Sequence, residues 1–186
     1  MKTTMIKVMS CNEAVRTKPQ PNTALLRILD SECGSALRNL TPLNHPESYS
    51  FIEHLTVDDI IPSYLEYEPE LVLFETRHFE QLLAFFEIAE NYETVIFHCS
   101  AGISRSSAMA ILFARYLNRL DLECVICLSH WIRPNPWILS FEKELNLPCF
   151  PEHLIPLRKK LYQDVEAGDK EIVFQSAVKL LKASSH

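Results

Sequence analysis

Short apolar runs bounded by turn residues recur along the first half of the chain and predict the strands of a sheet. Residues 4–9 and 24–30 are short, mainly apolar runs bounded by turn residues, as expected for buried strands. Residues 49–57 alternate more between apolar and polar side chains, which favours a strand near the edge of the sheet. A further run, Thr94-Val95-Ile96-Phe97, predicts another buried strand.

Apolar residues spaced three and four apart predict helices between and after these strands. One core-facing amphipathic helix is expected from about residue 71 to residue 91. An alanine-rich helix is expected from Arg105 to Leu120, close behind the last strand. Residues 153–165 and 169–182 predict two more helices, joined at Ala167-Gly168.

The alternation of strands and helices predicts an α/β fold. We expect a central, mainly parallel sheet of about four to five strands, flanked by helices and followed by a helical C-terminal extension. With 186 residues, 47% of them hydrophobic, the chain is long enough to bury a large core. Residues 1–150 are expected to form the main domain, and residues 151–186 to pack on it.

Charge and cysteine content narrow the classes of partner and compartment. A net charge of −6 argues against nucleic acid and anionic membranes as general partners. Six cysteines without the spacing of a disulfide framework favour a reducing compartment, so a cytoplasmic location is expected. The N-terminal apolar run is too short and too interrupted to be a signal peptide or a membrane span.

The candidate chemistry lies in one loop, His98-Cys99-Ser100-Ala101-Gly102-Ile103-Ser104-Arg105-Ser106, between the last strand and the helix that follows it. A five-residue turn onto a helix can point its backbone N–H groups inward, and with the helix dipole these form a cradle for a phosphate dianion. The same cradle would hold Cys99 as a thiolate. The planar guanidinium of Arg105 matches two phosphoryl oxygens and should bind the transition state more tightly than the ground state.

Other residues of the loop have supporting roles in this hypothesis. Gly102 permits the backbone conformation that the turn needs, and Ser106 can donate a hydrogen bond to the thiolate as it leaves an intermediate. His98 is expected to orient the loop by bonding backbone carbonyls. The remaining positions supply backbone N–H groups but no lysine or arginine, which argues against polyphosphorylated substrates such as phosphoinositides: Ser100, Ala101, Ile103 and Ser104.

The pattern His-Cys-x-x-Gly-x-x-Arg-Ser resembles the active-site loop of the protein tyrosine phosphatase superfamily. The short chain looks like the dual-specificity branch or the small tyrosine phosphatase-like proteins. The resemblance covers residues 49–141 and is sharp only over the loop. It implies a cysteine phosphatase-like fold and hydrolysis of phosphotyrosine, with phosphoserine and phosphothreonine as further candidates, in a phosphorylated protein or peptide. The implied phosphocysteine mechanism needs no metal and no cofactor. The alternative is a chance Cys-x5-Arg spacing around a buried core thiol.

A phosphatase of this type needs a carboxylic acid on a loop after a strand, to protonate the leaving oxygen and then to activate water. The third predicted strand ends directly before Asp58-Asp59-Ile60-Ile61-Pro62. The resemblance places the acid on Asp59, with Asp58 as the second candidate. The alternative is that both aspartates only cap a turn.

Two later segments carry weaker signals. Residues 131–141 loosely resemble the Arg-Pro…Pro-Asn…Phe segment of dual-specificity phosphatases, which makes Asn135 a candidate for orienting the hydrolytic water; the alternative is a proline-rich turn. Cys124, Cys127 and His130 suggest a metal site, but no fourth ligand has credible spacing, so buried cysteines on an apolar helix face are expected.

Three functions are compatible with such a loop. The leading one is a cysteine-dependent phosphomonoester hydrolase. The second is a phosphate-binding interaction module, a pseudophosphatase, in which the acid is missing or misplaced. Sulfur transfer and arsenate reduction form the third class, which is disfavoured because the loop lies in mid-chain and carries the His-Cys and Arg-Ser pairs that sulfur transfer does not need.

Overall fold

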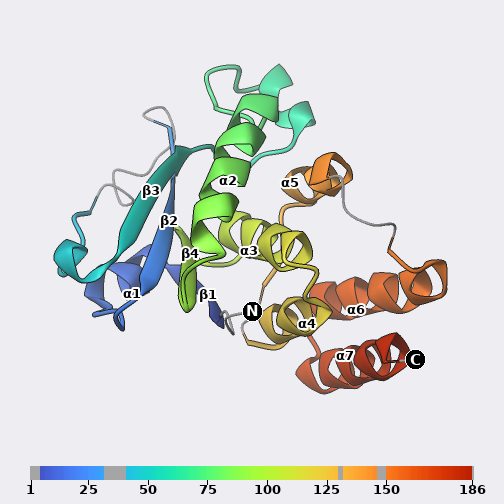
Figure 1. Ribbon diagram of the computed structural model, residues 1–186. Helices are drawn as coiled ribbons and strands as arrows, with labels where there is room; N and C mark the ends of the chain where they lie inside the picture. The colour runs from blue at the N-terminus through green and yellow to red at the C-terminus, as the bar shows by residue number, and fades with distance from the viewer. Residues whose placement is uncertain (1–4, 32–40, 130–131, 146–149, 186) are drawn as a thin grey trace.

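The computed structural model describes residues 5–31, 41–129, 132–145 and 150–185. Its centre is a four-stranded, wholly parallel sheet in the order β1-β4-β2-β3. The strands are β1 (Met5–Ser10), β2 (Thr23–Leu29), β3 (Phe51–Thr56) and β4 (Thr94–Cys99). Helices flank the sheet, so the predicted α/β class is confirmed (Figure 1).

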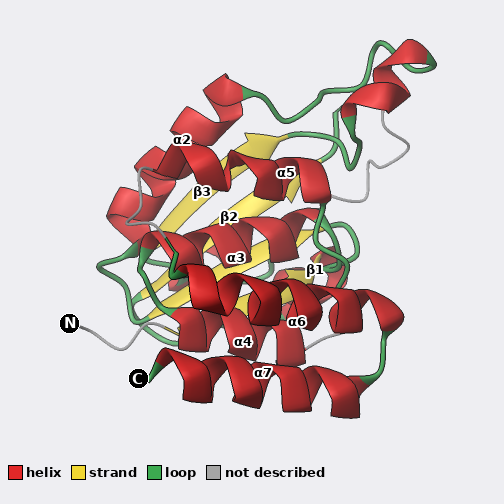
Figure 2. Ribbon diagram, turned by 90° about the vertical axis from the view of Figure 1, so that its right-hand side faces the viewer, coloured by secondary structure: helices red, strands yellow, loops and turns green. Residues whose placement is uncertain are grey.

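The helices lie unevenly on the two faces of the sheet. Figure 2 shows α2 to α7 on one side, with α6 and α7 forming an outer layer over α4. Alternate side chains of each strand point to opposite faces, so Leu26 and Phe97 enter the large core beneath these helices, whereas Leu25 and Ile96 enter a small core that contacts Val15 of α1. The α-helices are α1 (Cys11–Arg16), α2 (Thr76–Ala89), α3 (Arg105–Tyr116), α4 (Leu120–Ser129), α5 (Pro136–Ser140), α6 (Ile155–Ala167) and α7 (Lys170–Ser184). Short 3-10 turns are η2 (Pro46–Ser48), η3 (Pro62–Glu66), η4 (Phe141–Leu145) and η5 (Glu152–Leu154).

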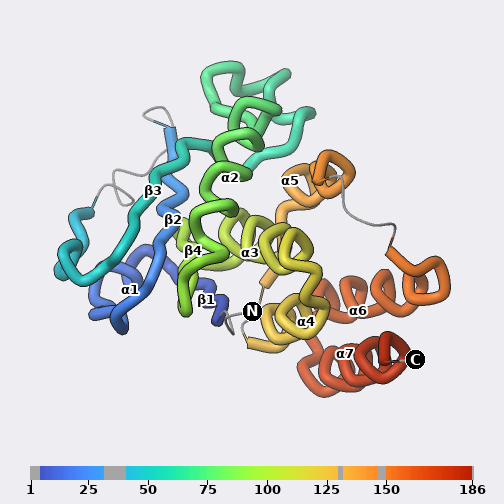
Figure 3. Tube along the Cα trace, viewed as in Figure 1, coloured from blue at the N-terminus to red at the C-terminus, as the bar shows by residue number. Residues whose placement is uncertain are grey.

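The parallel register brings the carboxyl ends of the strands to one edge of the sheet. Ser10 of β1 pairs with Cys99 of β4, and Leu29 of β2 pairs with Thr56 of β3. Figure 3 follows the chain from β4 through the loop into α3. The residues that follow all four strands therefore meet around this loop.

Two expectations about element boundaries and burial were wrong. The helix expected from residue 71 begins at Thr76, because the backbone N–H and C=O of Val72 both bond to Asp58 and hold that segment extended. The run at residues 4–9 was expected to be a buried strand, but β1 is a terminal strand of the sheet and its burial alternates. The expectation that residues 49–57 form a strand near the edge is confirmed by the position of β3.

Helix α1 was not predicted, although its signal is present in the sequence. Ser10 and Glu13 form a capping box in which the Ser10 hydroxyl accepts from Glu13 N at 3.3 Å and the Glu13 carboxylate accepts from Ser10 N at 2.8 Å. The Ser-x-x-Glu spacing marks such a helix start.

The C-terminal helices α6 and α7 form a hairpin that packs against α4. They turn at Gly168, whose positive φ of 78° suits glycine. A buried charge network ties α6 to the rest: Glu123 lies between Arg115 and Arg158, and both arginines also reach Glu142. Over the described ranges, none of the helices is long and apolar enough to span a bilayer.

Candidate functional site

The loop begins at Cys99, the last residue of β4, and ends where α3 starts at Arg105. The Cys99 side chain is buried, and its Sγ lies 3.1 Å from the hydroxyl of Ser106. Gly102 has a φ of +74°, and a Cβ at this position would lie 2.6 Å from the backbone of Met9 and Ser10. Only glycine fits this close crossing over the end of β1.

The backbone of the loop offers several unused donors. Among the residues that the structure describes, no acceptor bonds the backbone N–H groups of Ala101, Gly102, Ile103 and Ser104. These groups precede the positive end of the α3 dipole. Such an arrangement of free N–H groups is suited to binding an anion.

Arg105 is buried, and its guanidinium is held from one side. Nη1 donates to the carbonyl of Val57 at 2.7 Å and forms an ion pair with Asp30, and Nη2 donates to the Ser100 hydroxyl at 3.1 Å. Nε is buried and has no hydrogen-bond partner within the described part of the chain. Nε is thus the unsatisfied donor of this guanidinium, and a hydrogen bond to an oxyanion would satisfy it.

Asp30 was missed as a site residue. It directly follows β2, forms the ion pair with Arg105 and accepts a hydrogen bond from the Ser100 hydroxyl at 2.8 Å. Its signal was available: a carboxylate at the carboxyl end of a buried parallel strand lies at the edge where such sites form. From the sequence, Asp30 was expected only to end a buried strand.

The structure separates the two candidate aspartates. Asp58 is buried, and its carboxylate accepts backbone N–H bonds from Ser31 at 3.0 Å and Val72 at 2.7 Å, which ties two segments of the chain together. Asp59 is exposed and turns to the loop, where its Oδ1 accepts from the Ser104 hydroxyl at 2.7 Å. Of the two predicted candidates, only Asp59 is placed beside the loop.

Asn135 also contacts Asp59, but not in the role that was expected for it. Its Nδ2 donates to Asp59 Oδ1 at 2.9 Å and to the Ile60 carbonyl at 3.2 Å. Its Oδ1 caps α5 by accepting from the N–H groups of Trp137 and Ile138. Because the amide group is fully engaged, Asn135 holds the carboxylate of Asp59 rather than orienting a water molecule.

His98 lies behind the loop and is fully buried. Its Nε2 accepts from Arg27 Nε at 3.1 Å, which places the proton of the neutral ring on Nδ1. Burial, and then the positive charge of Arg27, lower the pKa of His98 to about 4. Arg27 occupies Nε2, and an interaction of the ring with the backbone of Cys99 opposes the lowering of this pKa. The expected orienting role of His98 toward the loop backbone stays a prediction.

The described ranges contain no cluster of three or more histidine, cysteine or acidic side chains that could hold a metal ion. Cys124 and Cys127 are buried in α4, as expected for core cysteines. Burial raises the pKa of Cys124 to about 12 and that of Cys127 higher still, so both thiols stay neutral. His130, the third residue of the suggested metal site, lies outside the described residues.

Comparison with known proteins adds no assignment: no protein-family model matches the chain, and no curated protein matches its sequence.

Proposed function

We propose that this chain is a cysteine-dependent phosphomonoester hydrolase of the protein tyrosine phosphatase type, acting on phosphotyrosine and also on phosphoserine or phosphothreonine in proteins. The observation that carries the proposal is the contact of Asp59 with the loop, 2.7 Å from its Oδ1 to the Ser104 hydroxyl. Through this contact a carboxyl group lies at the loop that carries Cys99, the unsatisfied Nε–H of Arg105 and the unused backbone donors. A module that only binds phosphate has no need of that carboxyl group.

In the first step the Cys99 thiolate attacks phosphorus in line with the ester bond. The sulfur–phosphorus bond forms, the ester oxygen–phosphorus bond breaks, and the leaving oxygen takes a proton from Asp59. Since Ser104 and Asn135 both donate to Oδ1, the transferable proton sits on Oδ2, which accepts no hydrogen bond from the described residues. Arg105 and the loop N–H groups bind the equatorial oxygens of the phosphoryl group.

In the second step the phosphocysteine is hydrolysed. The Asp59 carboxylate takes a proton from water as the water oxygen attacks phosphorus, and the sulfur–phosphorus bond breaks to release inorganic phosphate. The Ser106 hydroxyl, 3.1 Å from Cys99 Sγ, stabilises the departing thiolate by donating a hydrogen bond. This sequence balances without a metal or an organic cofactor.

The chemistry also bears on substrate and compartment. No lysine or arginine side chain from positions 100–104 supplements Arg105, which suits a single phosphoryl group better than a polyphosphorylated head group.

A thiolate nucleophile works only while it is reduced, so we propose a reducing compartment, the cytoplasm, as the location of the protein.

The decisive experiment compares wild type with Asp59→Asn on aryl phosphates of graded leaving-group pKa. With a poor leaving group, such as the phenolate of a phosphotyrosine peptide, we expect kcat to fall by about 100-fold or more, because the departing oxygen receives no proton. With a leaving group that departs as an anion, kcat should fall far less. Asp121→Asn, which changes a surface aspartate paired with Arg119, is the matched control.

Binding and turnover distinguish the hydrolase from the binding module. Cys99→Ser should abolish turnover while still binding tungstate, a tetrahedral oxyanion, when measured by calorimetry. If wild type binds tungstate but releases no phosphate from any aryl phosphate or phosphopeptide, the chain is a phosphate-binding module and the proposal fails.

A further inference from the structure

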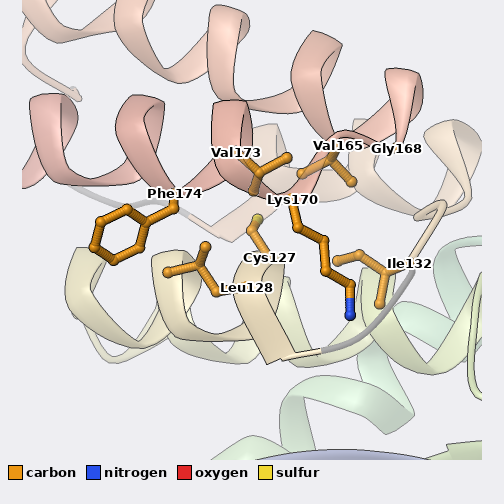
Figure 4. Close-up of a pocket in the computed structure, with 8 residues that line it drawn as sticks. All are labelled: Cys127, Leu128, Ile132, Val165, Gly168, Lys170, Val173 and Phe174. Carbon is orange, nitrogen blue, oxygen red and sulfur yellow. The ribbon is translucent and has the colours of Figure 1, made fainter.

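A cavity lies away from the Cys99 loop, between α4 and the turn that joins α6 to α7 (Figure 4). Its volume is about 270 Å³, and no residue of the loop lines it. Its apolar walls are Cys127, Leu128, Ile132, Val165, Val173 and Phe174.

The walls suit a hydrocarbon or aryl group. Ile132, Val165 and Val173 are buried, whereas the ring of Phe174 is 53% exposed and would gain cover from a ligand. Burial raises the pKa of the Cys127 thiol, so this wall carries no charge. At roughly 30 Å³ for each water molecule, the space corresponds to about nine waters and admits a ligand of about eight to ten non-hydrogen atoms.

One charged group accompanies these walls. Figure 4 shows the side chain of Lys170 running across the pocket, with its amine beside Ile132. Across the described ranges Lys170 has no carboxylate within ion-pair distance. Lys170 is the first residue of α7, where the helix dipole disfavours a positive charge. A contribution to the stability of α7 therefore does not explain why a lysine stands at this position.

We infer that this pocket binds a small amphipathic anion, an aliphatic or aryl carboxylate whose apolar part fills the cavity and whose carboxylate pairs with Lys170. An apolar pocket with one convergent polar group is the usual form of a small-molecule site. Because the apolar pocket carries a single positive charge, it should bind carboxylic acids more tightly than alcohols or amines of the same chain length. The inference does not depend on phosphatase activity.

Octanoate is the probe, added to the full chain and followed by heteronuclear NMR and calorimetry. We expect saturable binding with a dissociation constant of about 0.1–1 mM, in keeping with a ligand of this size. Octan-1-ol should bind more weakly than octanoate, and octylamine should bind about tenfold more weakly or not at all. Shifted signals should come from the pocket residues on α4 and α7.

Variants separate the charge from the cavity. Lys170→Gln should weaken octanoate about five- to tenfold and leave octan-1-ol unchanged, whereas Lys182→Gln, on the same helix but outside the pocket, should change neither. Val173→Phe should fill the cavity and abolish binding of both. If that variant does not fold, Phe174→Ala at a half-exposed site should weaken both probes instead.

Three results would overturn the proposed site. The first is the absence of saturable octanoate binding up to about 10 mM, a concentration well above the dissociation constant expected for a ligand of this size. The others are equal affinities for octanoate and octylamine, and an unchanged octanoate affinity in Lys170→Gln.

Discussion

At the scale of single residues, Asp30 decides how Arg105 is presented. Its ion pair with Nη1, together with the Val57 carbonyl, holds the guanidinium, and Nε has no hydrogen-bond partner among the described residues. The bond from the Ser100 hydroxyl extends the same restraint to the loop. In the proposed mechanism Asp30 is therefore a positioning residue rather than a group that touches the phosphoryl oxygens.

We therefore predict that Asp30→Asn lowers kcat/KM for an aryl phosphate by about 10- to 100-fold, since small displacements of a binding group are costly. Tungstate affinity should fall as well, because the guanidinium loses its fixed orientation. The melting temperature should also fall, because the buried guanidinium loses its ion-pair partner. Steady-state kinetics and calorimetry measure the first two effects. Unchanged kinetics in the variant would show that Arg105 needs no such restraint.

A second residue-scale prediction concerns His98 and pH. Its pKa is about 4 in the folded chain and about 6.5 when unfolded, so between these values only the unfolded chain takes up the proton. The free energy of unfolding should therefore fall as the pH drops from about 6.5 to about 4, by up to about 3 kcal/mol.

Urea denaturation across this pH range tests the prediction. In His98→Gln the free energy of unfolding should depend less on pH. The difference between the pH profiles of wild type and the variant gives the contribution of His98 alone. Burial also lowers the pKa values of His54 and His78, so part of the slope should survive the substitution. Identical profiles for the variant and wild type would contradict the assignment.

At the scale of elements, the segment carrying Asp59, the Cys99 loop and the start of α5 are joined at one carboxylate. The Ser104 hydroxyl and the Asn135 amide both donate to Asp59 Oδ1, and Asn135 N also donates to the Ser104 carbonyl at 3.3 Å. The Asp59 carboxylate is therefore held both by the Cys99 loop and by Asn135, the N-cap residue of α5.

We predict that Ser104→Ala lowers kcat about five- to tenfold for a poor leaving group, which corresponds to the loss of one hydrogen bond of about 1 kcal/mol. For a good leaving group kcat should hardly change, because protonation is then unnecessary. The exposed Ser140, whose hydroxyl bonds only within α5, supplies the matched control Ser140→Ala. Equal losses for both leaving groups would indicate a general disturbance of the loop instead.

The C-terminal helices depend on a different inter-element contact. Burial opposes ionisation of Glu123, but Arg115 and Arg158 outweigh it and lower the pKa of this carboxyl to about 2. The Tyr162 hydroxyl adds a hydrogen bond of 2.6 Å. Removing the charge of Glu123 would leave the buried Arg115 and the partly buried Arg158 with one partly exposed carboxylate between them.

Glu123→Gln should accordingly destabilise the chain by about 3 kcal/mol, the cost of breaking a buried ion pair. Thermal unfolding should show a melting temperature lower by about 6–12 °C for a chain of this size. Glu142→Gln, at a carboxylate that is 36% exposed, should cost less than about 1 kcal/mol. A larger effect at Glu142 than at Glu123 would refute this account of the network.

At the scale of the whole molecule, the parallel topology assembles the candidate site. Every strand runs the same way, so the residues that follow β1, β2, β3 and β4 converge at one edge. The two terminal positions of the sheet go to β1 and β3, and the central pair β4 and β2 carries the loop and Asp30. The apolar pocket at Lys170 lies in the outer helical layer, apart from this edge.

The sequence by itself determined the features that depend on local spacing. Apolar periodicity predicted the four strands, α2, α3 and the C-terminal pair, because burial of one helix face or of a whole strand leaves its trace in neighbouring residues. The loop could also be recognised from local spacing, because Cys99, Gly102 and Arg105 lie within seven consecutive positions. The start of α2 was misplaced because a distant residue, Asp58, holds Val72 extended.

Only the tertiary structure decided which polar side chains meet. Asp59 bonds a serine 45 residues away, Ser100 bonds an aspartate 70 residues away, and Asn135 reaches Asp59 across 76 residues. Neither adjacency nor periodicity encodes such pairs, because strand order and register set them. The choice of Asp59 over Asp58 beside the loop, the presence of Asp30 and the contact of Arg27 with His98 therefore emerge only when the sheet is assembled.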